Sequence, residues 1–422
     1  MELIIYSLRT VSYAIIEPNY LFLLVVLGVV FYFKNKKISL MQRMTIGEVI
    51  NSPLELTLSQ IALGIIAGAI ISVVLSILGV IFNENSGIEI MFMISIFLIF
   101  IKKRYICFAY SGAILGLISI ISNLIANYTG YQSYINVNIV SLMVFVGVMH
   151  IVEGILVIFD GSRGAVPVFT NKENKIIGGF AYNRYWIMPV ALFIAITSNI
   201  SSVMTSGVET PNWWPIINRS ENLTLLASAI IASIPLYGVI GFRTVSFTKE
   251  KHIKPIYSGI SILIFGTLLT IISQLASLGL IGQIVVVVFA PLGHELMLKI
   301  QNKVENNGEY IYVSDDEGIS VLEVAKNAPA YECGIRRGDK IIEINNQKII
   351  SEVDIFNIVK GSFTEINFKI KKLSGEIIDL KVFPNKKRLG ILVVPRAVKK
   401  ENAIKIDNDN FKKILEEMKR KQ

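Results

Sequence analysis

Cysteine, histidine and charged residues are all scarce in this chain of 422 residues. The two cysteines, Cys107 and Cys333, lie far apart in the sequence, which argues against a disulfide framework and fits a reducing compartment. Only 17% of the residues are charged, whereas 53% are hydrophobic, and the mean hydropathy is +0.58. Because this composition is too apolar for a soluble globular protein, it indicates a polytopic membrane protein.

Apolar stretches dominate the first three quarters of the chain. Nine of them are long enough, or nearly so, to cross the hydrocarbon core of a bilayer, which is about 30 Å thick. We therefore predict an α-helical polytopic domain of about nine spans at 18–299, preceded by an interfacial segment at 1–17. The predicted spans are 18–33, 57–82, 87–101, 105–127, 138–159, 185–205, 223–242, 255–276 and 278–299.

Basic residues follow the odd-numbered spans up to the seventh, and few lie on the other side. The positive-inside rule then predicts an amino terminus outside the cell and a carboxyl-terminal domain in the cytosol. The net charge of +9 is explained mainly by this topology and by attraction to anionic lipid, and not by a nucleic-acid partner. The basic residues assigned to the inner side are Lys34, Lys36, Lys37, Arg43, Lys102, Lys103, Arg104, Arg163, Lys172, Lys175, Arg184, Arg243, Lys249, Lys251 and Lys254.

Three connecting segments have recognisable local patterns. Trp213 and Trp214 are expected at the outer surface, where indoles anchor to lipid headgroups. Residues 164–189 contain two β-type runs around a polar turn and favour a hairpin on the inner side. Asp160 and Gly161 are interpreted as a turn.

From Gly318 the pattern changes to short runs of alternating apolar and polar residues, which predict β-strands. Among them stands the sequence NAPAYECGIRRGDKIIEINNQKI. It is similar to the bacterial PDZ element, in which a Pro-Ala helix leads into a Gly-x-x-x-Gly-Asp turn, here Gly334 to Asp339. We predict a small mixed α/β PDZ domain of permuted topology at 318–395, after a linker at 300–317. A basic amphipathic tail is expected at 396–422.

A PDZ resemblance implies peptide binding, because these domains add an extended peptide to an open sheet edge and hold its carboxylate with backbone amides. We assign this edge to the final strand, where Gly390 would give the amides room, and the facing wall to the preceding helix. The alternative is that the final strand only closes the sheet. The predicted binding residues are Arg388, Leu389, Gly390, Ile391, Ile355, Phe356 and Val359.

Two His-Glu pairs lie in the predicted membrane domain: His150 with Glu153 in the fifth span, and His294 with Glu295 near the inner end of the ninth. Ionisable groups at such depth are functional candidates, and the two pairs can form a small polar cluster. Interhelical hydrogen bonding is the expected role of both pairs. A zinc protease needs a second histidine four residues after the first, but Leu298 stands there. We predict no catalytic residue, no metal and no cofactor.

The segments HIVEGILVIFDG, PVF and GGFAYNRYWIMP, together with many spans ending in one PDZ domain, resemble the MinJ-type topology proteins of Gram-positive bacteria. The resemblance implies a scaffold of the cell membrane, enriched at septa, that helps to place the division site. It also implies DivIVA-like and MinD-like protein partners, and homo-oligomers are compatible with it. The alternative function is that of a divergent site-2-protease-like membrane metalloprotease, or of a regulatory partner of a membrane protease.

Overall fold

The computed structural model describes residues 1–101, 107–131, 133–172, 175–196, 211–226, 229–362, 364–384 and 388–396. The chain forms two compact units. The first unit comprises Met1–Met44, Val49–Val166 and Phe180–Glu309, and the second comprises Thr45–Glu48, Pro167–Gly179 and Tyr310–Gln422. Apart from Arg396, the predicted basic tail lies outside the described residues.

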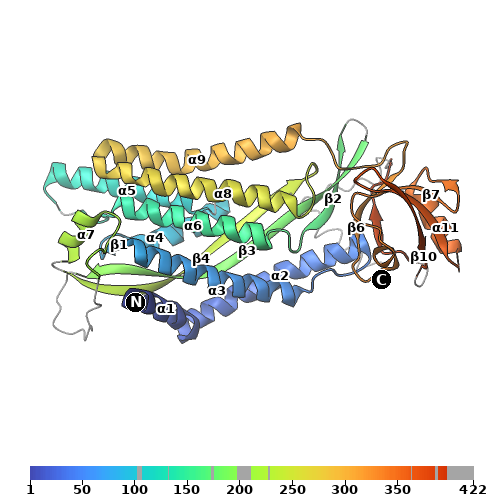
Figure 1. Cartoon of the computed structure of the whole chain (residues 1–422). Helices are drawn as coiled ribbons and strands as arrows, with labels where there is room; N and C mark the ends of the chain where they lie inside the picture. Colours follow the sequence, from blue (N-terminus) through green and yellow to red (C-terminus); the bar gives the residue numbers. More distant parts are fainter. Residues whose placement is uncertain are drawn as a thin grey trace. The chain divides into compact units, whose positions relative to one another are not determined.

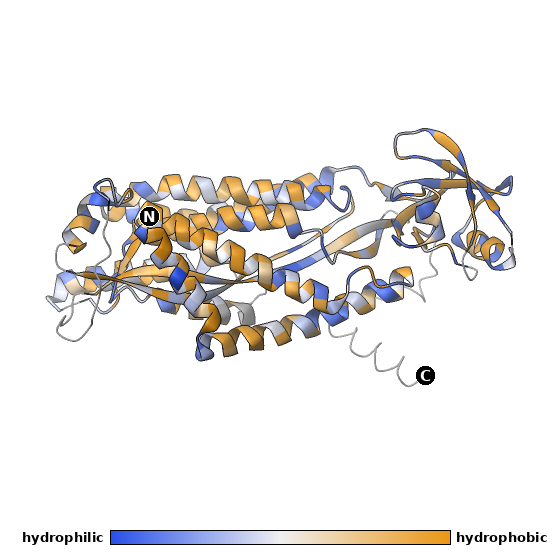
Figure 2. Ribbon diagram, turned by 60° about the horizontal axis from the view of Figure 1, so that its bottom comes forward, coloured by the Kyte–Doolittle hydropathy of each residue, from blue (hydrophilic) through white to orange (hydrophobic). Residues whose placement is uncertain are grey.

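Helices form most of the first unit, and hydrophobic residues dominate them in Figure 2. Among the described residues, five helical segments are long and apolar enough to cross a membrane. A sixth candidate is the pair α1 (Glu2–Ile16) and α2 (Pro18–Ile46), which meet at a bend of 67°. The five segments are α3 (Pro53–Leu78), α5 (Phe108–Thr129), α6 (Ile139–Asp160), α8 (Ile253–Ile272) with the short helix η3 (Ser273–Leu278), and α9 (Leu280–Asn307).

Two of the nine predicted helical spans are strands instead. β3 (Lys175–Ile196) and β4 (Ile230–Ser246) occupy much of 185–205 and 223–242, and 197–210 lies outside the described residues. Their antiparallel ladder runs from Phe180 paired with Ser246 to Ile196 paired with Ile230, a length of about 54 Å at 3.4 Å per residue. The prediction of helices from hydropathy was wrong here because β3 is buried on both faces and therefore lacks polar alternation.

Helix α3 covers one edge of β3, and two glycines allow the close approach (Figure 1). A Cβ atom added to Gly64 would lie 2.0 Å from the carbonyl oxygen of Ile187, and one added to Gly68 would lie 2.2 Å from that of Pro189. Four helix residues rise about 6.0 Å, and two strand residues rise about 6.8 Å. The spacing of the two helix glycines therefore matches the spacing of alternate strand residues.

Other groups complete the cover of this strand edge. The backbone N–H of Ala191 donates to Ser72 Oγ of α3 at 2.8 Å. Farther along, the short strand β1 (Ile81–Asn83) pairs in parallel with β3 at 193–195. An open strand edge in hydrocarbon would leave backbone groups without partners, and α3 and β1 together cover this edge of β3.

Helices α6 and α8 pack antiparallel through reciprocal glycine pairs. Gly147 faces the backbone of Gly266, and seven residues later Gly154 faces that of Gly259. Each added Cβ atom would lie between 2.6 and 2.9 Å from the carbonyl oxygen of the opposite glycine. Small residues at one-heptad spacing thus permit backbone contact along the whole seam, as in other membrane helix pairs.

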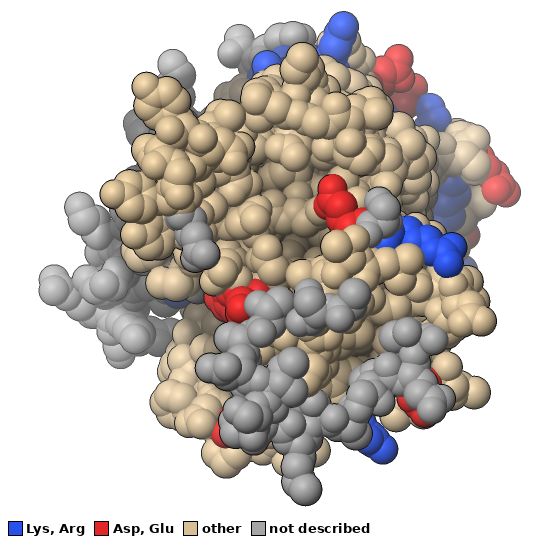
Figure 3. All heavy atoms as spheres, turned by 90° about the vertical axis from the view of Figure 1, so that its left-hand side faces the viewer, with Lys and Arg blue, Asp and Glu red and all other residues tan. Residues whose placement is uncertain are grey.

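The two neighbouring tryptophans at one end of the first unit differ in exposure. Before helix α7 (Arg219–Leu226), Trp214 is buried and donates its Nε1–H to the carbonyl oxygen of Ser76 at 2.7 Å, whereas Trp213 is half exposed. Only Trp213 can therefore serve as the predicted surface anchor. Figure 3 shows this end of the unit, where the described surface is mainly uncharged.

The second unit is built around a sheet with the strand order β10-β9-β7-β6-β11, and β8 pairs with β7. Asn345 and Asn346, both with positive φ, form a tight turn between β7 and β8. The elements of the second unit from Tyr310 onward are β5 (Tyr312–Val313), β6 (Ile319–Val324), α10 (Pro329–Glu332), β7 (Lys340–Ile344), β8 (Gln347–Lys348), α11 (Glu352–Gly361), β9 (Ile366–Lys371), β10 (Ile377–Val382) and β11 (Ile391–Val393).

A second group of strand residues belongs to this unit through 167–179. They come from β2 (Val166–Lys172) and from the first residues of β3, and they confirm that the two predicted β-type runs are paired strands. Ile177 and Gly178 of β3 pair with Val313 and Tyr312 of β5.

Candidate functional site

The edge strand of the second unit is the first candidate site. β11 pairs antiparallel with β6, where Ile391 lies opposite Val324, and no other described strand pairs with it. Ile391 and Val393 are half-buried against the apolar cluster that contains Ile355 and Val359 of α11. The final strand therefore lies at a sheet edge, beside the same apolar core that the helix helps to form.

The predicted binding residues differ in their exposure. Leu389 is buried in the core of the sheet, whereas Arg388 is exposed. On α11, Ile355 and Val359 are buried, but Phe356 is 62% exposed. Phe356 is thus the large apolar side chain of this set that remains available to a ligand.

Gly390 has a structural reason to be glycine. Its φ is +71°, and an added Cβ atom would lie 2.2 Å from Cβ of Ala328. Its carbonyl oxygen accepts the N–H of Ala325 at 2.9 Å, and that of Leu389 accepts the N–H of Ala330 at 3.2 Å. The loop before β11 is therefore held against the β6–α10 connection, and the glycine is needed there whether or not a ligand binds.

The second candidate site is a buried polar cluster in the first unit. His150 Nε2 lies 2.8 Å from Cys107 Sγ, and the rings of His150 and His294 are 5.8 Å apart between centroids. The two predicted histidines do come together, although His294 lies well inside α9, which continues beyond Lys299 to Asn307. Glu153 lies one turn after His150 and is half-buried. No sequence pattern predicts Cys107 as a member of this cluster, because tertiary packing alone brings it to His150.

A tyrosine connects the second His-Glu pair to helix α5. Tyr110 Oη lies 3.2 Å from His294 Nδ1 and donates to Glu295 Oε1 at 2.5 Å. Together with the contact between Cys107 and His150, this arrangement bridges α5, α6 and α9 by side-chain hydrogen bonds. Such bonds between helices are the kind of contact that polar groups make in an apolar surrounding.

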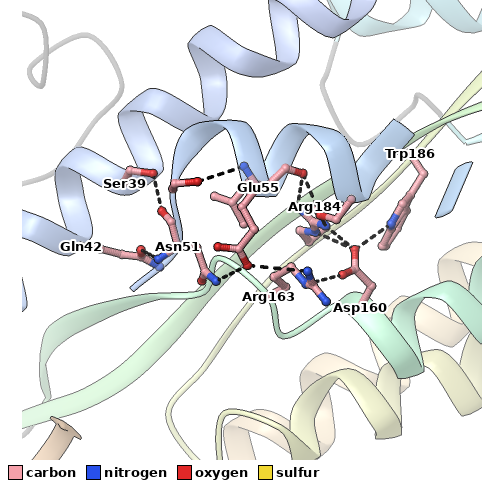
Figure 4. Close-up of polar contacts among 11 residues, drawn as sticks. Ser39, Gln42, Asn51, Glu55, Asp160, Arg163, Arg184 and Trp186 are labelled. Atoms are coloured by element: carbon pink, nitrogen blue, oxygen red, sulfur yellow. Dashed lines mark hydrogen bonds and ion pairs between the residues drawn. The ribbon is translucent and has the colours of Figure 1, made fainter. Parts of the chain in front are cut away.

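A buried ion pair at the end of α6 is the third candidate site (Figure 4). Arg184 Nε donates to Asp160 Oδ2 at 2.9 Å, and Trp186 Nε1 donates to the same oxygen at 2.9 Å. Arg184 also donates to the carbonyl oxygen of Leu56 at 3.2 Å and to Ser59 Oγ at 2.9 Å. Both charged side chains are almost completely buried.

Asp160 does begin the predicted turn, because its carbonyl oxygen accepts the N–H of Arg163 at 3.0 Å, but its carboxylate is buried. Arg184, which the charge pattern assigns to the basic connection after the fifth span, lies in β3 and is also buried. These groups are buried because β3 continues as a strand past α3 and α6. Around them, Arg163 Nε lies 2.9 Å from Asp160 Oδ1, and Arg163 Nη1 lies 3.7 Å from Glu55. The side-chain amide of Asn51 donates to Glu55 Oε1 at 3.1 Å. The backbone carbonyl oxygen of Asn51 accepts a hydrogen bond from Ser39 Oγ (Figure 4). The network joins α2, α3, α6 and β3.

These features define a PDZ-containing protein with a multi-helix apolar unit that fits membrane association. The PDZ domain family model matches residues 320–367, which include most of β6 and all of β7 and α11. The chain is similar to the cell division topological determinant MinJ of Bacillus subtilis (strain 168), with 25% identity over 240 residues. The aligned part covers 56% of this chain and 56% of that relative, so the chain matches about half of the length of MinJ. The similarity and the PDZ domain both agree with the predicted resemblance to MinJ-type PDZ proteins.

Proposed function

We propose that this chain is a multi-pass membrane scaffold whose cytosolic PDZ domain binds partner proteins during placement of the division site. The observation that carries the proposal is the edge position of β11 beside the apolar residues of α11 in a domain that matches the PDZ family. A peptide added to that edge would gain backbone hydrogen bonds from β11, and apolar side chains would give specificity.

The partners to test follow from the similarity to MinJ, whose name states a role in cell division topology. We propose DivIVA-like and MinD-like proteins, as the resemblance to MinJ-type proteins implies. A protease activity does not form part of the proposal. Leu298 occupies the position where a zinc protease has its second histidine, and a PDZ domain is an interaction module.

The cytosolic position of the PDZ domain is supported by the distribution of charge. With α4 (Ile88–Ile101) kept as the short third crossing, and β3 and β4 taken in place of two predicted helices, the proposed number of crossings stays at nine, so the sides assigned to the loops stay the same. Lys36, Arg163 and Lys249 then lie on the side of the PDZ domain, as the positive-inside rule requires.

Substitution of Phe356 tests the proposed peptide edge. Phe356→Ala removes an exposed aromatic side chain from α11, and we expect the Kd for a DivIVA-like or MinD-like protein to rise about tenfold or more. The matched control is Phe383→Ala, because Phe383 is 65% exposed and follows β10 at the opposite sheet edge. Binding is measured with the full chain in lipid nanodiscs. Equal affinity of both variants would reject the assignment of the groove.

Thiol labelling in whole cells tests the orientation. In a chain with Cys107→Ser and Cys333→Ser, Lys348→Cys should react with an impermeant reagent only after permeabilisation, because Lys348 is an exposed residue of the PDZ domain. Tyr134→Cys should react in intact cells, because this 92% exposed residue connects α5 and α6 on the predicted outer side. The reverse pattern would contradict the cytosolic position.

A further inference from the structure

The geometry points to a site for one transition metal ion, of the kind that Zn²⁺ represents, formed by Cys107, His150 and His294. One ligand atom from each residue lies within 4.8 Å of the others, and the residues come from three different helices or their ends. A tetrahedral zinc ion with nitrogen and sulfur ligands separates neighbouring donor atoms by roughly 3.3–3.6 Å, from bond lengths of about 2.0 and 2.3 Å. Only small side-chain movements are needed to reach this arrangement.

The hydrogen bonds of His150 orient it as a metal ligand. Its Nδ1 lies 2.7 Å from the carbonyl oxygen of Val146, which can only accept, so the ring proton is on Nδ1. The lone pair of Nε2 is then directed toward Cys107 Sγ, 2.8 Å away. A ring nitrogen that donates to a backbone carbonyl while the other faces the metal is the usual arrangement of histidine ligands.

His294 has an equivalent support on its own Nδ1. This atom contacts Tyr110 Oη at 3.2 Å, and the tyrosine in turn donates to the carboxylate of Glu295 at 2.5 Å. Such outer contacts fix the orientation of a ligating ring and raise its basicity. Both histidines are therefore held through Nδ1, and this shared feature distinguishes the cluster from a chance encounter of polar groups.

An aromatic side chain closes the cluster from one side. The ring of Phe265 in α8 lies edge-on to His150 at 5.0 Å and to His294 at 5.6 Å between centroids. The exposed fraction is 1% for His150 and 9% for His294. An apolar wall of this kind limits access of water, which strengthens the bonds between an ion and its ligands.

The donor set selects the class of metal. One thiolate and two imidazoles suit Zn²⁺ and Cu⁺, whereas Ca²⁺ and Mg²⁺ require oxygen ligands. On binding, the thiol of Cys107 loses its proton to solvent and the sulfur forms the bond to the metal, while both histidines bind as neutral rings. The ion would cross-link α5, α6 and α9. This inference is independent of the proposed scaffold function.

Zinc titration of the purified full chain tests the site. After removal of metal with a chelator, the wild type should bind one equivalent of Zn²⁺ in competition with a fluorescent indicator. Cys107→Ser and His150→Gln should weaken binding more than about 100-fold, and Tyr110→Phe about 10- to 100-fold, as for other outer-contact losses. The matched controls are Cys333→Ser and His252→Gln, which alter the remaining cysteine and histidine and should keep wild-type affinity.

Two further measurements keep the test decisive if a variant fails to fold. With Co²⁺ in place of Zn²⁺, the wild type and Cys333→Ser should show a sulfur-to-cobalt charge-transfer band. In the Cys333→Ser chain, Zn²⁺ should protect Cys107 from alkylation. Absence of stoichiometric Zn²⁺ uptake by the wild type would overturn the site. So would wild-type affinity in a folded Cys107→Ser variant, or equal alkylation of Cys107 with and without Zn²⁺.

Discussion

Strands β3 and β9 are both central strands of their sheets, but they are covered in different ways. In β9, buried residues alternate with more exposed ones, so Ile366, Phe368 and Ile370 face the core. In β3, buried residues follow one another without interruption from Trp186 to Ala195. A strand with one solvated face is stabilised by side-chain burial on the other face, whereas β3 must also satisfy its backbone edge inside an apolar unit.

The comparison indicates which groups each unit depends on. The first unit relies on close backbone approach at glycines and on the ion pair between Arg184 and Asp160. The PDZ domain relies on an apolar core, on turns with positive φ and on a capped helix. All three tryptophans lie in the first unit, so their fluorescence reports unfolding of that unit alone.

The largest effect is expected from the buried ion pair. Arg184→Met leaves the carboxylate of Asp160 buried without its main partner, and the free energy of unfolding of the first unit should fall by about 3–5 kcal/mol. The exposed pair of Lys381 with Glu365 in the PDZ domain is the control, and Lys381→Met should cost less than about 1 kcal/mol. Tryptophan fluorescence during denaturant titration measures the first change, and hydrogen exchange measures the second. Equally small losses of unfolding free energy for Arg184→Met and Lys381→Met would contradict the greater importance of the buried ion pair.

Packing of α3 on β3 should be the next most sensitive feature. Gly68→Ala places a methyl group against the carbonyl oxygen of Pro189, and we expect a loss of about 1–3 kcal/mol or more. Gly28→Ala in α2 is the control, because its nearest neighbour is the flexible end of Ile61 at 3.3 Å. The same fluorescence titration compares the two variants. Equal stabilities would show that the helix does not rest on the strand backbone.

In the PDZ domain, Gly390→Ala combines a strained φ with a steric clash against Ala328, and it should destabilise the domain by about 1–3 kcal/mol. Gly375→Ala separates the two causes, because Gly375 has a φ of +91° but no atom within 4 Å of an added Cβ. Its effect should therefore be smaller. Hydrogen exchange of peptides from 340–371 is the measurement, and a larger loss for Gly375→Ala would contradict the clash.

The smallest effect is expected at the start of α11. Ser351→Ala removes one half of the capping box formed with Asp354 and should cost about 1 kcal/mol.

Backbone N–H groups of Ser351 and Ile350 lower the pKa of Asp354 from its ordinary 3.8. A lowered pKa stabilises the fold fully above the ordinary value, and this contribution is lost as the pH falls through the folded value. Hydrogen exchange of the α11 amides should therefore differ between wild type and Asp354→Asn at neutral pH. The protection of these amides in the two chains should become equal in acid.

The PDZ domain could be predicted because β9 and β10 alternate less exposed with more exposed residues, so the period of two is visible in the sequence, and because Gly334 to Asp339 form a recognisable turn element. The β3–β4 hairpin could not, because apolar length is the same evidence for a buried strand as for a helix. Gly64 and Gly68 at a spacing of four signal close packing, but the sequence does not say that the partner is a strand. Cys107 and Tyr110 join His150 and His294 only through the tertiary packing of α5, α6 and α9.

Localisation of fluorescent fusions in dividing cells tests the central claim most directly. The wild-type chain should concentrate at septa. Phe356→Ala should remain in the membrane but lose this enrichment, while Phe383→Ala should keep it, because only the first variant alters the proposed peptide edge. Uniform membrane fluorescence of the wild type, with normal septum placement in cells that lack the protein, would contradict a scaffold function in division.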